Sequence, residues 1–155
     1  MPGKVYEIIT KATLSKGIKK SISKYEYQVN EIDKVLGCWI CNHCFQGILK
    51  DDKTVIEGGF DLHLWYSYLN DSYLLKQKVN YEDIVELNYY DKIKASDEIV
   101  VESLSLPRCI FASLDSNVIK IEIEKQMSLK IVGNTTILVE SKGEEELKIN
   151  QDFIK

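Results

Sequence analysis

The sequence has few of the features that divide a chain or direct it to a membrane. Prolines occur only at Pro2 and Pro107, so no proline-rich linker splits the 155 residues, and that length fits one domain. No window approaches the roughly 18 uninterrupted apolar residues that a membrane span needs. No apolar run follows Lys4, which argues against a secretory signal. We therefore expect a protein that is made for the cytoplasm or reaches a surface without the secretion route, and that does not insert directly into a membrane.

Catalytic motifs are missing as well. Neither His43 nor His63 belongs to a serine–histidine–aspartate order or lies beside paired carboxylates. Gly58 and Gly59 lack the lysine and the serine or threonine of a phosphate-binding loop. The sequence therefore predicts neither an enzyme nor a bound cofactor.

Basic charge is concentrated in the first 24 residues, which hold six lysines and one glutamate. The whole chain nevertheless has a formal net charge of −4 and no basic patch interleaved with aromatic side chains, so nucleic acid is not an expected partner. The basic segment is either a solvated face or a surface that meets the acidic body of another copy. For the second interpretation, Lys16, Lys19 and Lys20 are candidate contacts.

Residues 60–68 form the clearest element of the chain. Large side chains alternate with others, so the two sets take opposite faces of a strand. The set expected to face the core is Phe60, Leu62, Leu64, Tyr66 and Tyr68. His63 and Trp65 lie on the other face, where an aromatic ring calls for a covering partner. The pattern predicts the central strand of a sheet.

Period-2 segments separated by turn residues predict an all-β fold, an antiparallel β-sandwich-like single domain. Residues 3–15 fit a short N-terminal helix or an extra strand. Strands are expected to end at Gly17, at Pro107 and at the Gly133–Asn134 pair, with turns at 51–53, 70–72 and 115–117. We place this domain, with its lysine-rich N-terminal segment, at residues 1–140, followed by a short charged tail at 141–155.

A cluster of cysteines suggests a second class of function, a small metal-binding or redox module. Thiolates three residues apart can share a zinc ion. The candidate ligands are Cys38, Cys41, Cys44, Cys109 and His43. Thioredoxin-like chemistry needs its two cysteines at the start of a helix, which this segment does not provide.

The residues between the cysteines, Trp39 and Ile40, favour a strand instead. On an extended strand Cys38 and Cys44 face one side and Cys41 the other, so the three do not converge without a bulge. The remaining alternatives are buried free thiols that act as small hydrophobes and disulfide crosslinks between copies. For crosslinks the candidates are Cys38, Cys41, Cys44 and Cys109.

Several elements follow one another in a distinctive order across roughly residues 5–140. They are Tyr6-Glu7-Ile8-Ile9-Thr10-Lys11-Ala12, Leu36-Gly37-x-Trp39-Ile40-x-Asn42-His43, Glu57-Gly58-x-Phe60-Asp61, Trp65-Tyr66-Ser67-Tyr68, Pro107-x-Cys109 and Val132-Gly133-x-Thr135. Together they resemble the outer spore coat morphogenetic protein CotE family of endospore-forming bacteria.

The resemblance implies a non-enzymatic, self-assembling scaffold that organises assembly of the outer spore coat. It implies synthesis in the mother-cell cytoplasm, then a place in the outer coat around the forespore. Its partners would be itself, other coat proteins and a coat-basement ATPase. The family's long acidic tail is reduced here to Glu144-Glu145-Glu146, and Asn134 replaces the usual glutamate. Aromatic anchors commonly dominate such interfaces, so Trp39 and Trp65, with His63 beside them, are the leading assembly candidates.

Overall fold

The computed structural model describes residues 4–87, 93–94, 96–141 and 147–148. This part of the chain consists of strands joined by tight turns, and it contains no helix that could cross a membrane. The strands are β1 (Lys4–Gln28), β2 (Lys34–Lys50), β3 (Lys53–Tyr68), β4 (Asp71–Val85), β5 (Glu98–Asp115), β6 (Val118–Ser141) and β7 (Leu147–Lys148).

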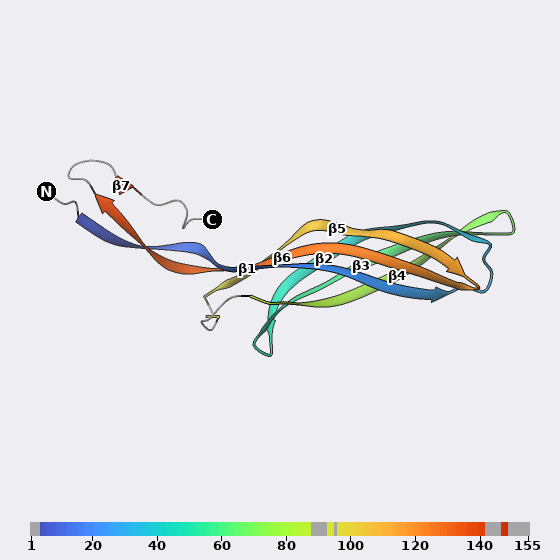
Figure 1. Ribbon diagram of the computed structural model, residues 1–155, viewed down its shortest axis with the longest axis horizontal. Helices are drawn as coiled ribbons and strands as arrows, with labels where there is room; N and C mark the ends of the chain where they lie inside the picture. Colours follow the sequence, from blue (N-terminus) through green and yellow to red (C-terminus); the bar gives the residue numbers. More distant parts are fainter. Residues whose placement is uncertain (1–3, 88–92, 95, 142–146, 149–155) are drawn as a thin grey trace.

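The strands form two antiparallel sheets that pack face to face (Figure 1). Sheet A has the order β1-β6-β5, with the short β7 paired to the end of β6. Sheet B has the order β2-β3-β4. This arrangement confirms the predicted all-β antiparallel sandwich, and the ambiguous N-terminal segment is part of a strand.

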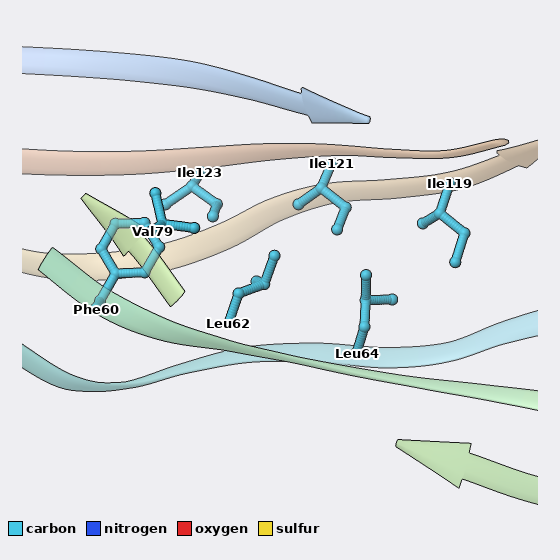
Figure 2. Close-up of a cluster of buried hydrophobic side chains, with 7 residues drawn as sticks. All are labelled: Phe60, Leu62, Leu64, Val79, Ile119, Ile121 and Ile123. Carbon is cyan, nitrogen blue, oxygen red and sulfur yellow. The ribbon is translucent and has the colours of Figure 1, made fainter. Parts of the chain in front are cut away.

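The central strands of the two sheets, β3 and β6, supply most of the core. Figure 2 shows side chains from β3 pointing toward side chains from β6, with Val79 of β4 beside them. The residues of this first cluster on the two central strands are Phe60, Leu62, Leu64, Ile119, Ile121 and Ile123. Phe60, Leu62 and Leu64 thus face the core as predicted, whereas Tyr66 and Tyr68 are only half buried. A second cluster contains Ile56, Val85, Met127, Leu129 and Ile131.

A buried polar cluster lies where the two apolar clusters meet. The ammonium of Lys125, a residue only 3% exposed, is 3.1 Å from the Asp83 carboxylate and 2.8 Å from the Ser21 hydroxyl. It also lies 4.1 Å from the centre of the Tyr81 ring, whose hydroxyl is 2.6 Å from Nε2 of His43. A charge is tolerated inside the sandwich because it is paired and hydrogen-bonded.

The strands are longer than the sequence predicts. The expected breaks at Gly17, Pro107 and Gly133 are wrong, because each residue lies inside a continuous strand. Gly17 is needed for close packing, since Val85 and Leu87 occupy the space that a side chain there would fill. Pro107 lies at a shift of register in β5, where the ladder takes no donor from it.

Beyond the sandwich, β1 and β6 continue as a two-stranded ribbon. β5 begins opposite Val132 of β6, whereas β1 and β6 stay paired out to Lys4 and Ser141. Figure 1 shows this ribbon projecting from the sandwich, with β7 beside its far end. We call residues 4–12 and 133–141 the arm. Most of the predicted tail, 142–146 and 149–155, lies outside the described residues, and the boundary at residue 140 stays a prediction.

Candidate functional site

The three predicted aromatic assembly residues lie together on the outer face of sheet B. In the β2–β3 ladder, Trp39 is opposite His63 and Gly37 is opposite Trp65. The Trp39 ring stacks on Trp65 and meets His63 edge-on, with centroids 5.8 Å apart in each pair. Trp39 itself is 42% exposed. We call Trp39, His63 and Trp65 the aromatic face. Its geometry suits a rigid, partly solvated contact surface.

A bulge in β2 changes the direction in which the cysteines point. Cys41 is opposite Asp61 and Cys44 is opposite Gly59, so both lie on the outer face. The expectation that Cys44 shares a face with Cys38 is therefore wrong. The physical reason is Asn42, whose φ of 54° is left-handed and whose amide donates a hydrogen bond of 2.8 Å to Asp61.

Cys41 makes a specific contact on this outer face. Its sulfur lies 3.5 Å from Nε2 of His63. Cys44 is exposed, whereas Cys41 is half buried. The outer face of sheet B therefore carries two thiols that solvent or another chain can reach.

Cys38 and Cys109 face the interior instead. Both pack against the first core cluster, Cys38 from β2 and Cys109 from β5. All four cysteines are free thiols. Because the thiols point in opposite directions, they cannot share one ion. Among the residues that the structure describes, no group of three or more metal-ligating side chains comes together.

His43 is also turned inward, away from Cys41 and Cys44. Its ring lies 5.0 Å from that of Phe45 and 5.7 Å from that of Tyr81. Burial, and then the positive charge of Lys125, lower the pKa of His43 below its ordinary value. Burial above all raises the pKa of Tyr81. His43 therefore takes part in the polar cluster of the core and not in a metal site.

The three predicted lysine contacts lie on β1, at an edge of sheet A. Lys16 and Lys20 face outward with Lys130 and Gln126, and Lys19 falls on the opposite side of the strand. All three are exposed, and none has a salt bridge to any described residue. Their ammonium groups are therefore available to a partner, although they do not form one patch.

The arm carries a surface that the sequence reading did not single out. Val5, Ile9 and Leu138 share one of its faces and are 64%, 74% and 65% exposed. Leu138 is opposite Glu7, so it lies between the two β1 residues across the ribbon. In the sequence, the even separation of Val5 and Ile9 on a β-prone segment could have indicated that they share one face of a strand. It could not have indicated that no sheet covers this face.

The family model described as Outer spore coat protein E (CotE) matches residues 4–154 of this chain. The chain belongs to the CotE family. No curated protein and no solved structure matches it. CotE-family membership makes this an outer spore coat protein of a structural family.

The family match and the geometry of the cysteines both bear on the choice between a spore coat protein and a metal-binding module. The metal-binding alternative has no support, because the cysteines diverge and the described residues offer no ligand cluster. What the structure does show in this CotE-family chain is a set of exposed surfaces. These are the aromatic face, the lysines of β1 and the face of the arm on which Val5, Ile9 and Leu138 lie with Glu7 and Glu140.

Proposed function

We propose that this chain is a self-assembling scaffold of the outer spore coat, on which other coat proteins are deposited. The observation that carries the proposal is the arm, a projecting ribbon with three aliphatic side chains about two-thirds exposed. A two-stranded ribbon is marginally stable in water. Burying aliphatic side chains contributes about 1.5–3 kcal/mol each. A second copy that covers the arm supplies that burial.

The occupant we assign to the arm is the same face of the arm in a second copy. Two such faces related by a two-fold axis place Val5, Ile9 and Leu138 against their counterparts, which is the self-complementary contact of a symmetric dimer. A dimer joined by arms leaves both sandwiches, and with them both aromatic faces, free for further contacts. Such a molecule has more than one interface, as growth into a shell requires.

The aromatic face is the second proposed contact. Trp39 and Trp65 form a stacked, partly exposed pair of the kind that anchors interfaces, and His63 lies at its edge. Lys16, Lys19 and Lys20 add positive charge that suits the acidic body of a neighbouring copy. Single and double alanine variants at Trp39 and Trp65 are expected to reduce assembly size in light scattering; unchanged sizes would remove this contact from the proposal.

The arm contact is tested by charge substitution. The variant V5D/I9D/L138D is expected to sediment as smaller species than wild type, because paired aspartates cannot be buried without cost. Leu69→Asp is the matched control, since Leu69 is 72% exposed in the β3–β4 turn, away from the arm. Sedimentation velocity at several concentrations gives the answer. Equal distributions for wild type and the arm variant would contradict the arm contact.

We further propose that Cys41 and Cys44 form disulfides between copies once the coat meets oxidant. Both thiols lie on the outer face, and His63 is in contact with Cys41. Gels of coat extracts run with and without reductant test this. Larger bands without reductant support crosslinking, and monomer-sized bands in both lanes contradict it.

Family membership also supports a proposal about place and partners. The protein is made in the mother-cell cytoplasm and recruited to the forespore by a coat-basement ATPase before other coat proteins are added. A fluorescent fusion followed through sporulation tests this order. A uniformly distributed signal in the mother cell throughout coat formation would contradict it.

A further inference from the structure

Cys38 and Cys109 come from facing sheets and meet inside the sandwich. Cys38 is opposite Leu64 in the β2–β3 ladder, and Cys109 is opposite Ile123 in the β5–β6 ladder. Leu64 and Ile123 both belong to the first core cluster, against which the two cysteines pack. The two thiols are neighbours, since Cys109 is the group that, after burial, acts most on the Cys38 thiol. The fold thus joins two cysteines that are far apart in the sequence.

The strands that carry these cysteines are themselves close together. β2 and β5 are edge strands of their sheets, and their Cα atoms approach within 8 Å. At Gly47 of β2, the side chains of Ile99 and Val101 of β5 fill the space of a missing side chain. Only a glycine permits so close an approach. A disulfide between the strands needs such closely packed edges, because its two Cα atoms must lie about 4.4–6.8 Å apart.

The Cys109 sulfur has a defined position. Its thiol donates a hydrogen bond of 3.3 Å to the carbonyl oxygen of Phe111, across a shift of register in β5. Burial, and then the neighbouring Cys109 thiol, raise the pKa of the Cys38 thiol.

We propose that Cys38 and Cys109 form a disulfide within one chain, tying sheet A to sheet B, when the protein meets a peroxide. One of the two sulfurs, as its thiolate, attacks the peroxide O–O bond and becomes a sulfenic acid, while the leaving oxygen takes up the proton released by that thiol and departs as water. The other sulfur then attacks the sulfenic sulfur, and the displaced hydroxide leaves as water with the second thiol's proton. Two thiols lose two hydrogens, and one hydrogen peroxide becomes two waters.

The disulfide between Cys38 and Cys109 has a different role from the crosslinks proposed for Cys41 and Cys44. Cys41 and Cys44 lie on the outer face, where other copies can reach them, whereas Cys38 and Cys109 are partly buried against the first core cluster. The inward pair would stabilise each subunit by closing a long loop in the unfolded chain. It does so whether or not the protein assembles, so the inference stands apart from the proposed scaffold function.

The test uses the full chain with Cys41→Ser and Cys44→Ser, which leaves only the inward pair. After treatment with hydrogen peroxide, we expect a monomer that has lost two hydrogens and both alkylatable thiols. Peptide mapping should find Cys38 joined to Cys109. The Tm should rise by roughly 10 °C and return on reduction.

The control adds Cys109→Ser to that background, where peroxide should not raise the Tm. Three results would overturn the inference: two thiols that remain alkylatable, sulfinic acids in place of the bond, or a link between two chains through either cysteine. An oxidised monomer whose Tm does not change would show that the bond does not tie the sheets together.

Discussion

At the scale of single residues, Lys125 carries a positive charge into the interior of the sandwich. Its ion pair with Asp83 and its contacts with Ser21 and Tyr81 take the place of water. The same charge acts on His43, whose ring is hydrogen-bonded to Tyr81. These side chains form one network, so a substitution of one of them changes the interactions of the others.

Removing the carboxylate from this network should be costly. Asp83→Asn leaves Lys125 buried without its counter-charge, and we expect the free energy of unfolding to fall by about 3–5 kcal/mol. Glu82→Gln is the matched control, because Glu82 pairs with Lys50 on the surface and such pairs contribute at most about 1 kcal/mol. Urea unfolding measures the free energy of unfolding of both variants. Equal losses for the two variants would contradict the account of the network.

His43 should make stability depend on pH. Folding lowers the pKa of His43. Just below the ordinary pKa of 6.5, His43 is therefore protonated in the unfolded chain while it stays neutral in the folded chain. The stability contributed by neutral His43 is therefore full above pH 6.5 and is lost as pH falls toward the folded pKa. Urea midpoints measured on the acid side should decline less steeply in His43→Gln than in wild type. Urea midpoints that fall equally with pH in the wild type and in His43→Gln would contradict this role of His43.

At the scale of elements, the turns and the central strand were predictable, and the lengths of the strands were not. Alternation at 60–64 identified β3 because one face is buried and the other is not. Turn residues at 51–53 and 115–117 correctly placed two hairpins. Gly17 and Gly133 were misread as breaks because the neighbours that fill the space beside them come from elsewhere in the chain.

The inward and outward directions of the cysteines depend on features that local patterns do not encode. The bulge at Asn42 moves Cys44 to the face of Cys41, and only its left-handed backbone shows this. The meeting of Cys38 with Cys109 depends on how two sheets pack. The aromatic face was predictable, since Trp39, His63 and Trp65 needed only the pairing of two neighbouring strands.

The β3–β4 hairpin contains a residue that does not suit its turn. Leu69 and Asn70 have φ values of 50° and 62°, a two-residue turn that favours asparagine and glycine. Leu69→Asn should therefore raise the free energy of unfolding by about 1 kcal/mol. Leu106→Asn is the control, since Leu106 is equally exposed but lies in β5. A gain at both sites, or at neither, would contradict this explanation.

At the scale of the whole molecule, the sandwich and the arm have different roles. The sandwich buries its central strands on one side and leaves the aromatic face outward on sheet B. The arm buries Ile137 and Val139 on one face, but on its other face Val5, Ile9 and Leu138 remain largely exposed. A stable subunit that presents an incomplete element is suited to assembly, because the missing contacts can come from another copy.

Electron microscopy of the purified full chain, across a range of concentrations, tests this account most directly. The account predicts ordered assemblies for the wild type and for Leu69→Asp, and smaller particles for V5D/I9D/L138D. A wild-type protein that remains strictly monomeric at the highest concentration would contradict the claim that this chain is a self-assembling scaffold.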